Sequence, residues 1–154
     1  MKISRLIIIM LINSLVLPCC TAPSGHNEWD CNGVFNARLT GDVEQQLCIN
    51  EVDDYQLNKQ LLHFKVKNFD IAGRSLFDLK LENYAGPGSY DFGQDQLSRF
   101  SLNVYGASDE FYRCVSGKIV VSEASANSLQ ADFEVVLEGF YNKKTIHARG
   151  GIHL

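Results

Sequence analysis

The chain has 154 residues and carries 14 basic and 18 acidic side chains, which gives a formal net charge of −4 at pH 7. The basic residues are scattered and do not alternate with aromatic residues, so the pattern excludes a nucleic-acid-binding surface. This length is enough for one domain with a hydrophobic core of its own.

The first segment has the pattern of a secretory signal peptide. Lys2 and Arg5 make a positively charged start, and residues 6–17 form an almost uninterrupted apolar run. Such a run is too short to span a bilayer as a helix, which needs about 20 apolar residues. We therefore interpret residues 1–19 as a signal peptide that is removed from the mature protein.

The apolar run ends in Leu17-Pro18-Cys19-Cys20. This ending resembles the lipobox of bacterial lipoproteins, in which a leucine lies three residues before a cysteine. The resemblance implies that the thiol of Cys20 receives a diacylglycerol and that Cys20 becomes the first mature residue. Cys19 is the alternative lipidation position, but it would place Pro18, whose φ is locked and which has no N–H, before the scissile bond.

Small and polar residues follow the lipobox-like ending and predict a flexible, lipid-anchored tether over residues 20–29, before a folded domain at 30–154. Several acyl chains would hold such a protein stably at a membrane, since one chain alone binds marginally. Thr21 rather than aspartate follows Cys20, and by resemblance to enteric lipoproteins this implies the outer membrane of a bacterial cell envelope. Ordinary cleavage after Ala22 is the rival to lipidation.

The rest of the chain alternates apolar and polar residues along short runs, as strands with one buried face do. The clearest run lies at 129–137, with Val136 as its one exception. Val115 is expected to share a face with Ile119 and Val121 farther along the chain. The residues expected to meet in one core are Phe64, Phe77, Leu79, Phe100, Leu102, Phe133 and Val135.

Segments rich in glycine, asparagine, aspartate, proline and serine separate these runs and supply the residues that turns require. No segment after residue 25 keeps a helical period over three turns. Short strands at this spacing predict an all-β fold, which we take to be an antiparallel β-sandwich of about eight or nine strands. A small β-barrel is the alternative.

Two segments carry a second resemblance. Residues 81–93 read LENYAGPGSYDFG, and residues 114–139 read CVSGKIVVSEASANSLQADFEVVLEG. Their Gly-Pro-Gly-x-Tyr turn, Ser-Gly strand start and following hairpin resemble small β-sandwich lipoproteins of bacterial envelopes. These motifs are turns and strand starts, so the resemblance implies a fold and no active site.

Three cysteines follow the tether, and they are too far apart for a C-x-x-C redox or zinc motif. Export to an oxidising compartment favours a disulfide between two of them. If a hairpin turns at Gly41, Cys31 and Cys48 are not opposite each other, and a disulfide needs Cα atoms within roughly 7 Å. The prediction is therefore a Cys48–Cys114 bond, with Cys31–Cys114 as the close rival.

The sequence contains no G-x-S-x-G motif and no recognisable order of catalytic triad residues. His147 and His153 have the same strand parity but are separated by roughly 20 Å at ~3.3 Å per residue, too far for one ion. The acidic residues at 51–54 lack the template of a calcium loop and predict a solvated turn. We expect no catalytic residue, no metal site and no cofactor.

Aromatic residues are concentrated between residues 84 and 112. Tyr84, Tyr90, Tyr105 and Tyr112 are candidates for an exposed surface that contacts a protein or glycan, because tyrosine is enriched at interfaces. The alternative is packing in the core and at strand edges, where aromatic residues are also favoured.

These patterns favour an envelope-anchored lipoprotein that binds or scaffolds another molecule without catalysis. Its expected partners are the membrane, through the N-terminal lipid, and a protein or glycan of the envelope. The alternative is a lipoprotein that inhibits a secreted hydrolase such as lysozyme, which predicts a loop that inserts into the cleft of the enzyme.

Overall fold

The computed structural model describes residues 31–68, 75–93, 98–104 and 110–154. The predicted signal peptide, the tether and Cys20 lie outside these residues. Within them the chain forms ten strands: β1 (Phe35–Gly41), β2 (Gln45–Ile49), β3 (Val52–Asn58), β4 (Leu61–Asn68), β5 (Ser75–Glu82), β6 (Gly88–Phe92), β7 (Arg99–Val104), β8 (Glu110–Ser125), β9 (Ser128–Gly139) and β10 (Thr145–His153). Among the described residues, no helix is long and apolar enough to cross a membrane.

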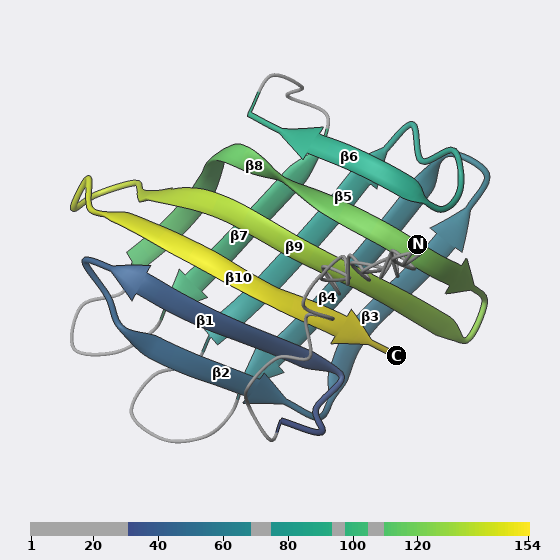
Figure 1. Cartoon of the computed structure of the whole chain (residues 1–154), viewed down its shortest axis with the longest axis horizontal. Coiled ribbons are helices and arrows are strands. Elements are labelled where there is room, and N and C mark those ends of the chain that lie inside the picture. Colours follow the sequence, from purple (N-terminus) through teal and green to yellow (C-terminus); the bar gives the residue numbers. More distant parts are fainter. Residues whose placement is uncertain (1–30, 69–74, 94–97, 105–109) are drawn as a thin grey trace, which may run out of the picture.

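All ten strands belong to one antiparallel sheet. Nine of them follow the order β2-β1-β10-β9-β8-β7-β5-β4-β3, and β6 pairs separately with β8. Strands β3, β4, β5 and β7 lie behind β1, β2, β9 and β10, so the sheet covers itself (Figure 1). The all-β prediction is confirmed.

The sheet curls because of strand β8. This strand is 16 residues long and pairs with β9 along most of its length, while its other edge pairs first with β7 and then with β6. Two register shifts, between Cys114 and Ser116 and between Val121 and Glu123, interrupt its pairing with β9. Bulges of this kind bend a strand and increase its twist, so β8 connects the two layers.

The two separate sheets of a sandwich are not confirmed, because the strands form one continuous curled sheet that resembles half of a barrel. The barrel-like alternative fits this arrangement. The physical reason is the length of β8, which takes part in both layers and keeps their hydrogen bonding continuous. Alternating strands alone do not distinguish the two folds, because both bury one face of each strand.

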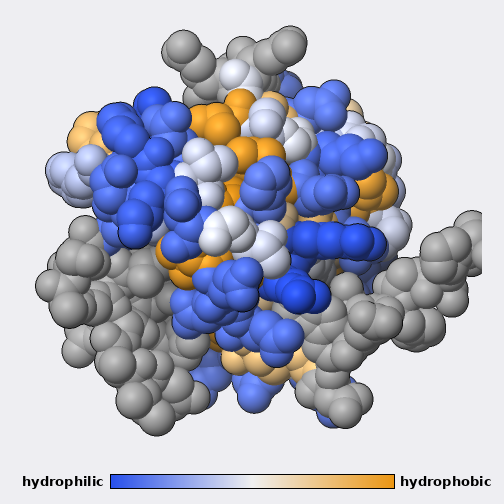
Figure 2. Space-filling view, turned by 60° about the vertical axis from the view of Figure 1, so that its left-hand side comes forward, coloured by the Kyte–Doolittle hydropathy of each residue, from blue (hydrophilic) through white to orange (hydrophobic). Residues whose placement is uncertain are grey.

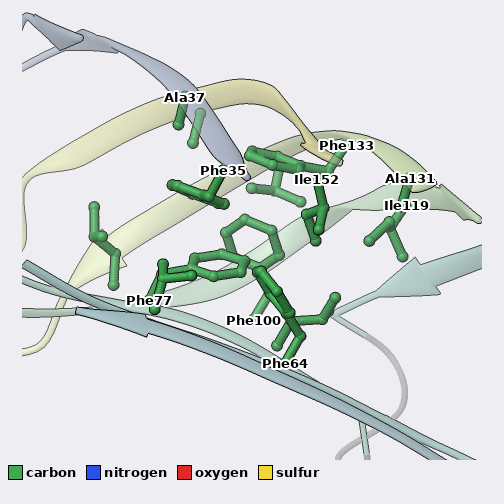
Figure 3. Close-up of a cluster of buried hydrophobic side chains, with 14 of the residues drawn as sticks. Phe35, Ala37, Phe64, Phe77, Phe100, Ile119, Ala131, Phe133 and Ile152 are labelled. Carbon is green, nitrogen blue, oxygen red and sulfur yellow. The ribbon is translucent and has the colours of Figure 1, made fainter. Parts of the chain in front are cut away.

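The core lies between the two layers. Phe35 from β1 and Phe133 from β9 face Phe77 from β5 and Phe100 from β7 (Figure 3). The ring centroids of Phe77 and Phe35 are 4.3 Å apart, and those of Phe77 and Phe100 are 4.6 Å apart. All seven residues expected in one core are buried in it, which confirms that prediction.

The alternation of β9 is visible directly in its burial, since Leu129, Ala131 and Phe133 are buried and the residues between them are exposed. Val115 departs from the prediction. It is 38% exposed, whereas Ile119 and Val121 are buried. The bulge between Cys114 and Ser116 adds a residue to β8, which reverses the alternation before that point.

Candidate functional site

The most exposed large hydrophobic side chains of the described residues lie in the turn between β9 and β10. Phe140 is 49% exposed and Tyr141 is 75% exposed. We call residues 140–144 the hairpin tip. Figure 2 brings forward the side of the molecule on which this turn lies, and there hydrophobic patches appear between hydrophilic side chains. Two large hydrophobic side chains exposed together at one turn make the tip a candidate contact surface.

The backbone of the tip is held by residues of β8 that lie far away in the sequence. The carboxylate of Glu110 accepts hydrogen bonds from the backbone N–H of Tyr141, at 2.9 Å, and of Asn142, at 3.1 Å. The backbone N–H of Phe140 donates to the carbonyl of Phe111 at 2.8 Å. Hydrogen bonds to a carboxylate are stronger than those between neutral groups, so Glu110 fixes the position of the tip relative to β8.

Asn142 supplies the second set of contacts within the turn. Its side-chain nitrogen donates to the hydroxyl of Tyr112 at 3.3 Å, and its side-chain oxygen accepts from the backbone N–H of Lys144 at 2.8 Å. Gly139 leaves room for this side chain, because a Cβ at that position would lie 2.1 Å from the Asn142 oxygen and would displace it. The turn is therefore fixed both from β8 and from within.

The side chains of the tip combine two aromatic rings with two cations. The rings of Phe140 and Tyr141 are in edge-to-face contact, with centroids 5.0 Å apart. The ammonium of Lys143 lies 5.5 Å from the Phe140 ring centre and 3.7 Å from the Glu138 carboxylate. Lys144 is exposed beside them. Aromatic residues dominate the binding energy of many interfaces, and a fixed turn loses little conformational entropy on binding.

The structure does not support the expected surface of exposed tyrosines. Tyr84 and Tyr112 are buried, with 6% and 3% of their surface exposed, so the prediction is wrong for both. Tyr90 is half-buried and stacks on Tyr84 with centroids 5.5 Å apart. Tyr105 lies outside the described residues.

The physical reason is that Tyr84 packs in the core, while the hydroxyls of Tyr90 and Tyr112 hold neighbouring turns. The Tyr90 hydroxyl donates to the carbonyl of Gly86 and accepts from the N–H of Ala85, which closes the Gly-Pro-Gly turn. The Tyr112 hydroxyl accepts from Asn142 at the base of the hairpin tip. The alternative reading of core and edge packing therefore holds for Tyr84 and Tyr112.

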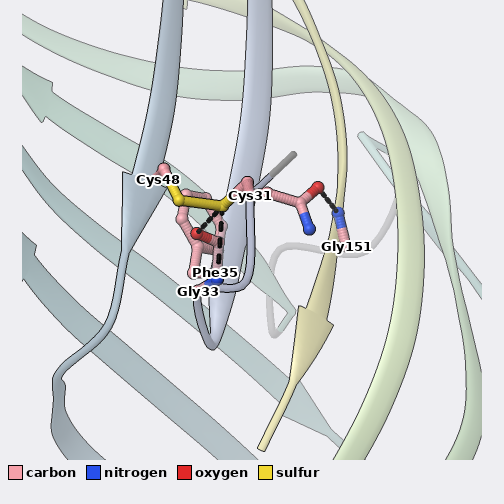
Figure 4. The surroundings of a disulfide bond; sticks show 6 residues. Cys31, Gly33, Phe35, Cys48 and Gly151 are labelled. Carbon is pink, nitrogen blue, oxygen red and sulfur yellow. Dashed lines mark hydrogen bonds between the residues drawn. A yellow bond between two sulfur atoms is a disulfide. The ribbon is translucent and has the colours of Figure 1, made fainter. Parts of the chain in front are cut away.

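The predicted Cys48–Cys114 disulfide is also wrong. Cys48 is bonded to Cys31, and their Cα atoms are 5.8 Å apart (Figure 4). The prediction assumed that β1 extends back to Cys31, but the strand begins at Phe35 and the chain bends at Gly33. A Cβ on Gly33 would lie 2.6 Å from the carbonyl oxygen of Ile49, so this glycine lets the chain fold close over β2 and bring Cys31 to Cys48.

Cys114 is a free cysteine and is half-buried in β8. Burial raises the pKa of its thiol to about 11, and a backbone hydrogen bond with Ser116 offsets part of that rise. A thiol with such a pKa is almost entirely protonated at neutral pH, and the protonated form is a poor nucleophile.

One histidine lies between two carboxylates on the outer face of the β3-β4-β5 layer. Nδ1 of His63 is 3.4 Å from Asp54, and Nε2 is 3.0 Å from Asp78. Asp53, on the neighbouring position of β3, pairs with Lys67 at 2.9 Å. Among the described residues, no group of three or more His, Cys, Asp or Glu side chains is placed to hold a metal ion.

The acidic segment 51–54 was expected to be a solvated turn, but its Asp53 and Asp54 belong to β3 and only Glu51 lies before that strand. Sequence reasoning also missed the hairpin tip, which it treated only as a turn. The available signal was the adjacent pair Phe140-Tyr141 directly before Asn142, because two large aromatic residues are unusual in a turn segment.

Comparisons of the chain with models of protein families, with curated proteins and with solved structures find no match.

Proposed function

We propose that this chain is a non-catalytic binding or scaffolding module of the bacterial cell envelope, anchored by lipid on Cys20, and that the hairpin tip contacts its protein partner. The observation that carries the proposal is the exposed pair Phe140 and Tyr141, held in place by Glu110. The signal-like and lipobox-like start of the sequence supports the location at the membrane.

The geometry of the tip suits a protein contact. Aromatic side chains supply large contact areas with few rotatable bonds, and the flanking Lys143 and Lys144 supply charge at the rim. The Glu110 hydrogen bonds hold the turn in one conformation before binding, which lowers the entropy lost when a partner binds.

Site-specific photo-crosslinking in cells that export the full chain tests this proposal. A photoreactive phenylalanine replaces Tyr141 in one strain and replaces Val120, which is 42% exposed on β8, in a matched control strain. We expect one discrete crosslinked protein with the probe at position 141 and none at position 120. Combining the probe with Glu110→Gln should reduce that product, because the carboxylate that fixes the turn is lost.

Equal products at the two positions, or no product at position 141, would contradict the role of the tip. The anchor is tested separately by mass spectrometry of the mature N-terminus. A diacylglyceryl group on Cys20 is expected, and a soluble product that starts at Pro23 would contradict the lipid anchor.

The second candidate function is inhibition of a secreted hydrolase such as lysozyme. The observation that favours it is the combination of exposed Tyr141 with Lys143 and Lys144 on one fixed turn, because glycosidase clefts carry carboxylates. The purified mature chain should then slow the lysis of bacterial cell walls by lysozyme, and the paired change Tyr141→Ala and Lys144→Ala should abolish the effect. Unchanged lysis with a molar excess of the chain would rule out lysozyme as the target.

A further inference from the structure

A groove with a volume of about 640 Å³ lies on the outer face of the sheet, over strands β7 and β8. Ser101 and Asn103 of β7 line it, together with Phe111 and Arg113 of β8 and with Arg99 at the start of β7. In the strand register Ser101 is opposite Arg113 and Asn103 is opposite Phe111, so these four side chains lie on one face of neighbouring strands.

The groove is bounded where β6 ends beside the bulge of β8. Gly93 follows β6 with a φ of +101°, and a Cβ at this position would lie 2.2 Å from the carbonyl oxygen of Val115. The backbone therefore passes in direct contact with β8, as glycine allows. Since the bulge turns β8 at this point, Gly93 and Val115 form one wall of the groove.

The charge in the groove that is free to meet a ligand is positive. Asp78 also lines it, but one of its carboxylate oxygens is 3.0 Å from His63 and the other is 3.7 Å from Lys65. Arg113 forms an ion pair with Glu138 at 3.7 Å, and the same Glu138 carboxylate also pairs with Lys143 at 3.7 Å.

Arg99 has no ion pair among the residues that the structure describes, and its side chain is exposed. Arg99 and Arg113 lie one strand and two residues apart, which places their Cα atoms roughly 8 Å from each other.

We propose that this groove binds a carboxylate-bearing sugar. Arg99 and Arg113 carry planar guanidinium groups that match a carboxylate with two parallel hydrogen bonds. Ser101 and Asn103 can donate to and accept from sugar hydroxyls, and the half-buried ring of Phe111 offers an apolar surface to the C–H groups of a sugar ring. The volume lies within the ~300–1,000 Å³ that small-ligand sites occupy.

This inference goes beyond the proposed function and does not depend on it, because it concerns a ligand bound on the outer face of β7 and β8 and not a partner of the hairpin tip. Neutral sugars and small anions are the two simplest ligands to compare, since a neutral sugar lacks the carboxylate and a small anion lacks the sugar ring. The proposal requires both the carboxylate and the sugar ring.

Isothermal titration calorimetry on the mature chain tests the proposal with trigalacturonate, its fully methyl-esterified form and inorganic phosphate as probes. The ester has the same sugar rings but no charge. We expect trigalacturonate to bind at least about tenfold more tightly than the ester and than phosphate, because a charged hydrogen-bonded pair contributes about that factor. Raising the salt concentration should weaken the binding, since the contact is partly exposed.

The variants Arg99→Gln and Arg113→Gln should each weaken the binding of trigalacturonate about tenfold. Arg149→Gln, an exposed arginine on β10, is the matched control and should leave it unchanged. Unaltered melting temperatures of the variants show that they fold. Absence of trigalacturonate binding at millimolar concentration, equal binding of acid and ester, equal binding of phosphate, or an equal loss in the Arg149 variant would each overturn the proposal.

Discussion

Two neighbouring residues of β9 offer the sharpest test of how the layers pack. Phe133 is 3% exposed, and its ring lies 4.9 Å from that of Phe100, 5.7 Å from that of Phe35 and 6.0 Å from that of Phe77, measured between centroids. Glu134 follows it on the same strand but faces solvent. Changing each to alanine removes a large side chain from opposite faces of one strand.

The expected loss for Phe133→Ala follows from what its ring contacts. Returning a buried side chain of this size to water costs ~1.5–3 kcal/mol. The cavity left between the layers and the loss of three aromatic neighbours add to this cost, so we expect a total of about 4 kcal/mol, within the ~3–5 kcal/mol typical of such changes. Glu134→Ala removes no packing and should change the free energy of unfolding by less than about 0.5 kcal/mol.

Chemical denaturation monitored by circular dichroism measures both free energies of unfolding directly, and a thermal scan should show a melting temperature about 10–20 °C lower for Phe133→Ala. Similar losses for the two variants would refute the assignment of faces on β9. A small loss for Phe133→Ala alone would refute the aromatic cluster as the main contact between the layers.

Three further predictions follow from the cysteines and one glycine. The double change Cys31→Ser and Cys48→Ser should lower the free energy of unfolding by about 3 kcal/mol, because the disulfide joins residues 17 positions apart. A non-reducing peptide map should show the peptides of Cys31 and Cys48 linked. A linked peptide that contains Cys114 would contradict the pairing. Burial raises the pKa of Cys114 to about 11, so its alkylation by iodoacetamide in the folded chain should be slow at pH 7.5 and accelerate as the pH rises towards 11. A rate that is already constant above pH 8 would refute the raised pKa of this buried thiol. Gly117→Ala should destabilise the chain by ~1–3 kcal/mol, because its φ is +129° and the new Cβ would lie 2.4 Å from a backbone oxygen of β9; an unchanged urea midpoint would count against this strained position.

Part of the candidate site was accessible from the sequence and part was not. The turn at the end of β9 is visible as a local run of turn residues after an alternating strand. The hydrogen bonds from Glu110 that hold this turn are not visible in the sequence. Glu110 is separated from Tyr141 by 31 residues and meets it only when β8 pairs with β9. The groove is equally inaccessible, since Arg99 and Arg113 are brought to one face by the register of β7 and β8.

The tyrosines show that the burial of a single aromatic side chain is also hard to predict from its local sequence. An aromatic residue in a strand or turn has the same local pattern whether it faces solvent or a neighbouring layer. Tyr84, just after β5, and Tyr112, in β8, are both buried in the core, and residues near them along the chain do not show which way their rings face.

The amino-acid sequence by itself determined the inward faces of the regularly alternating strands, such as β9, because side chains alternate with a period of two along an extended backbone and need no distant partner to do so. It did not determine the start of β3 or the face of Val115 at the bulge of β8. It also determined the placement of Phe133 and the other core residues. Only the tertiary structure decided that one sheet curls over itself, because this depends on where the bulges bend β8. It likewise decided that Cys31 pairs with Cys48, because a bend at Gly33 before the first strand brings together two cysteines that a straight hairpin would keep apart.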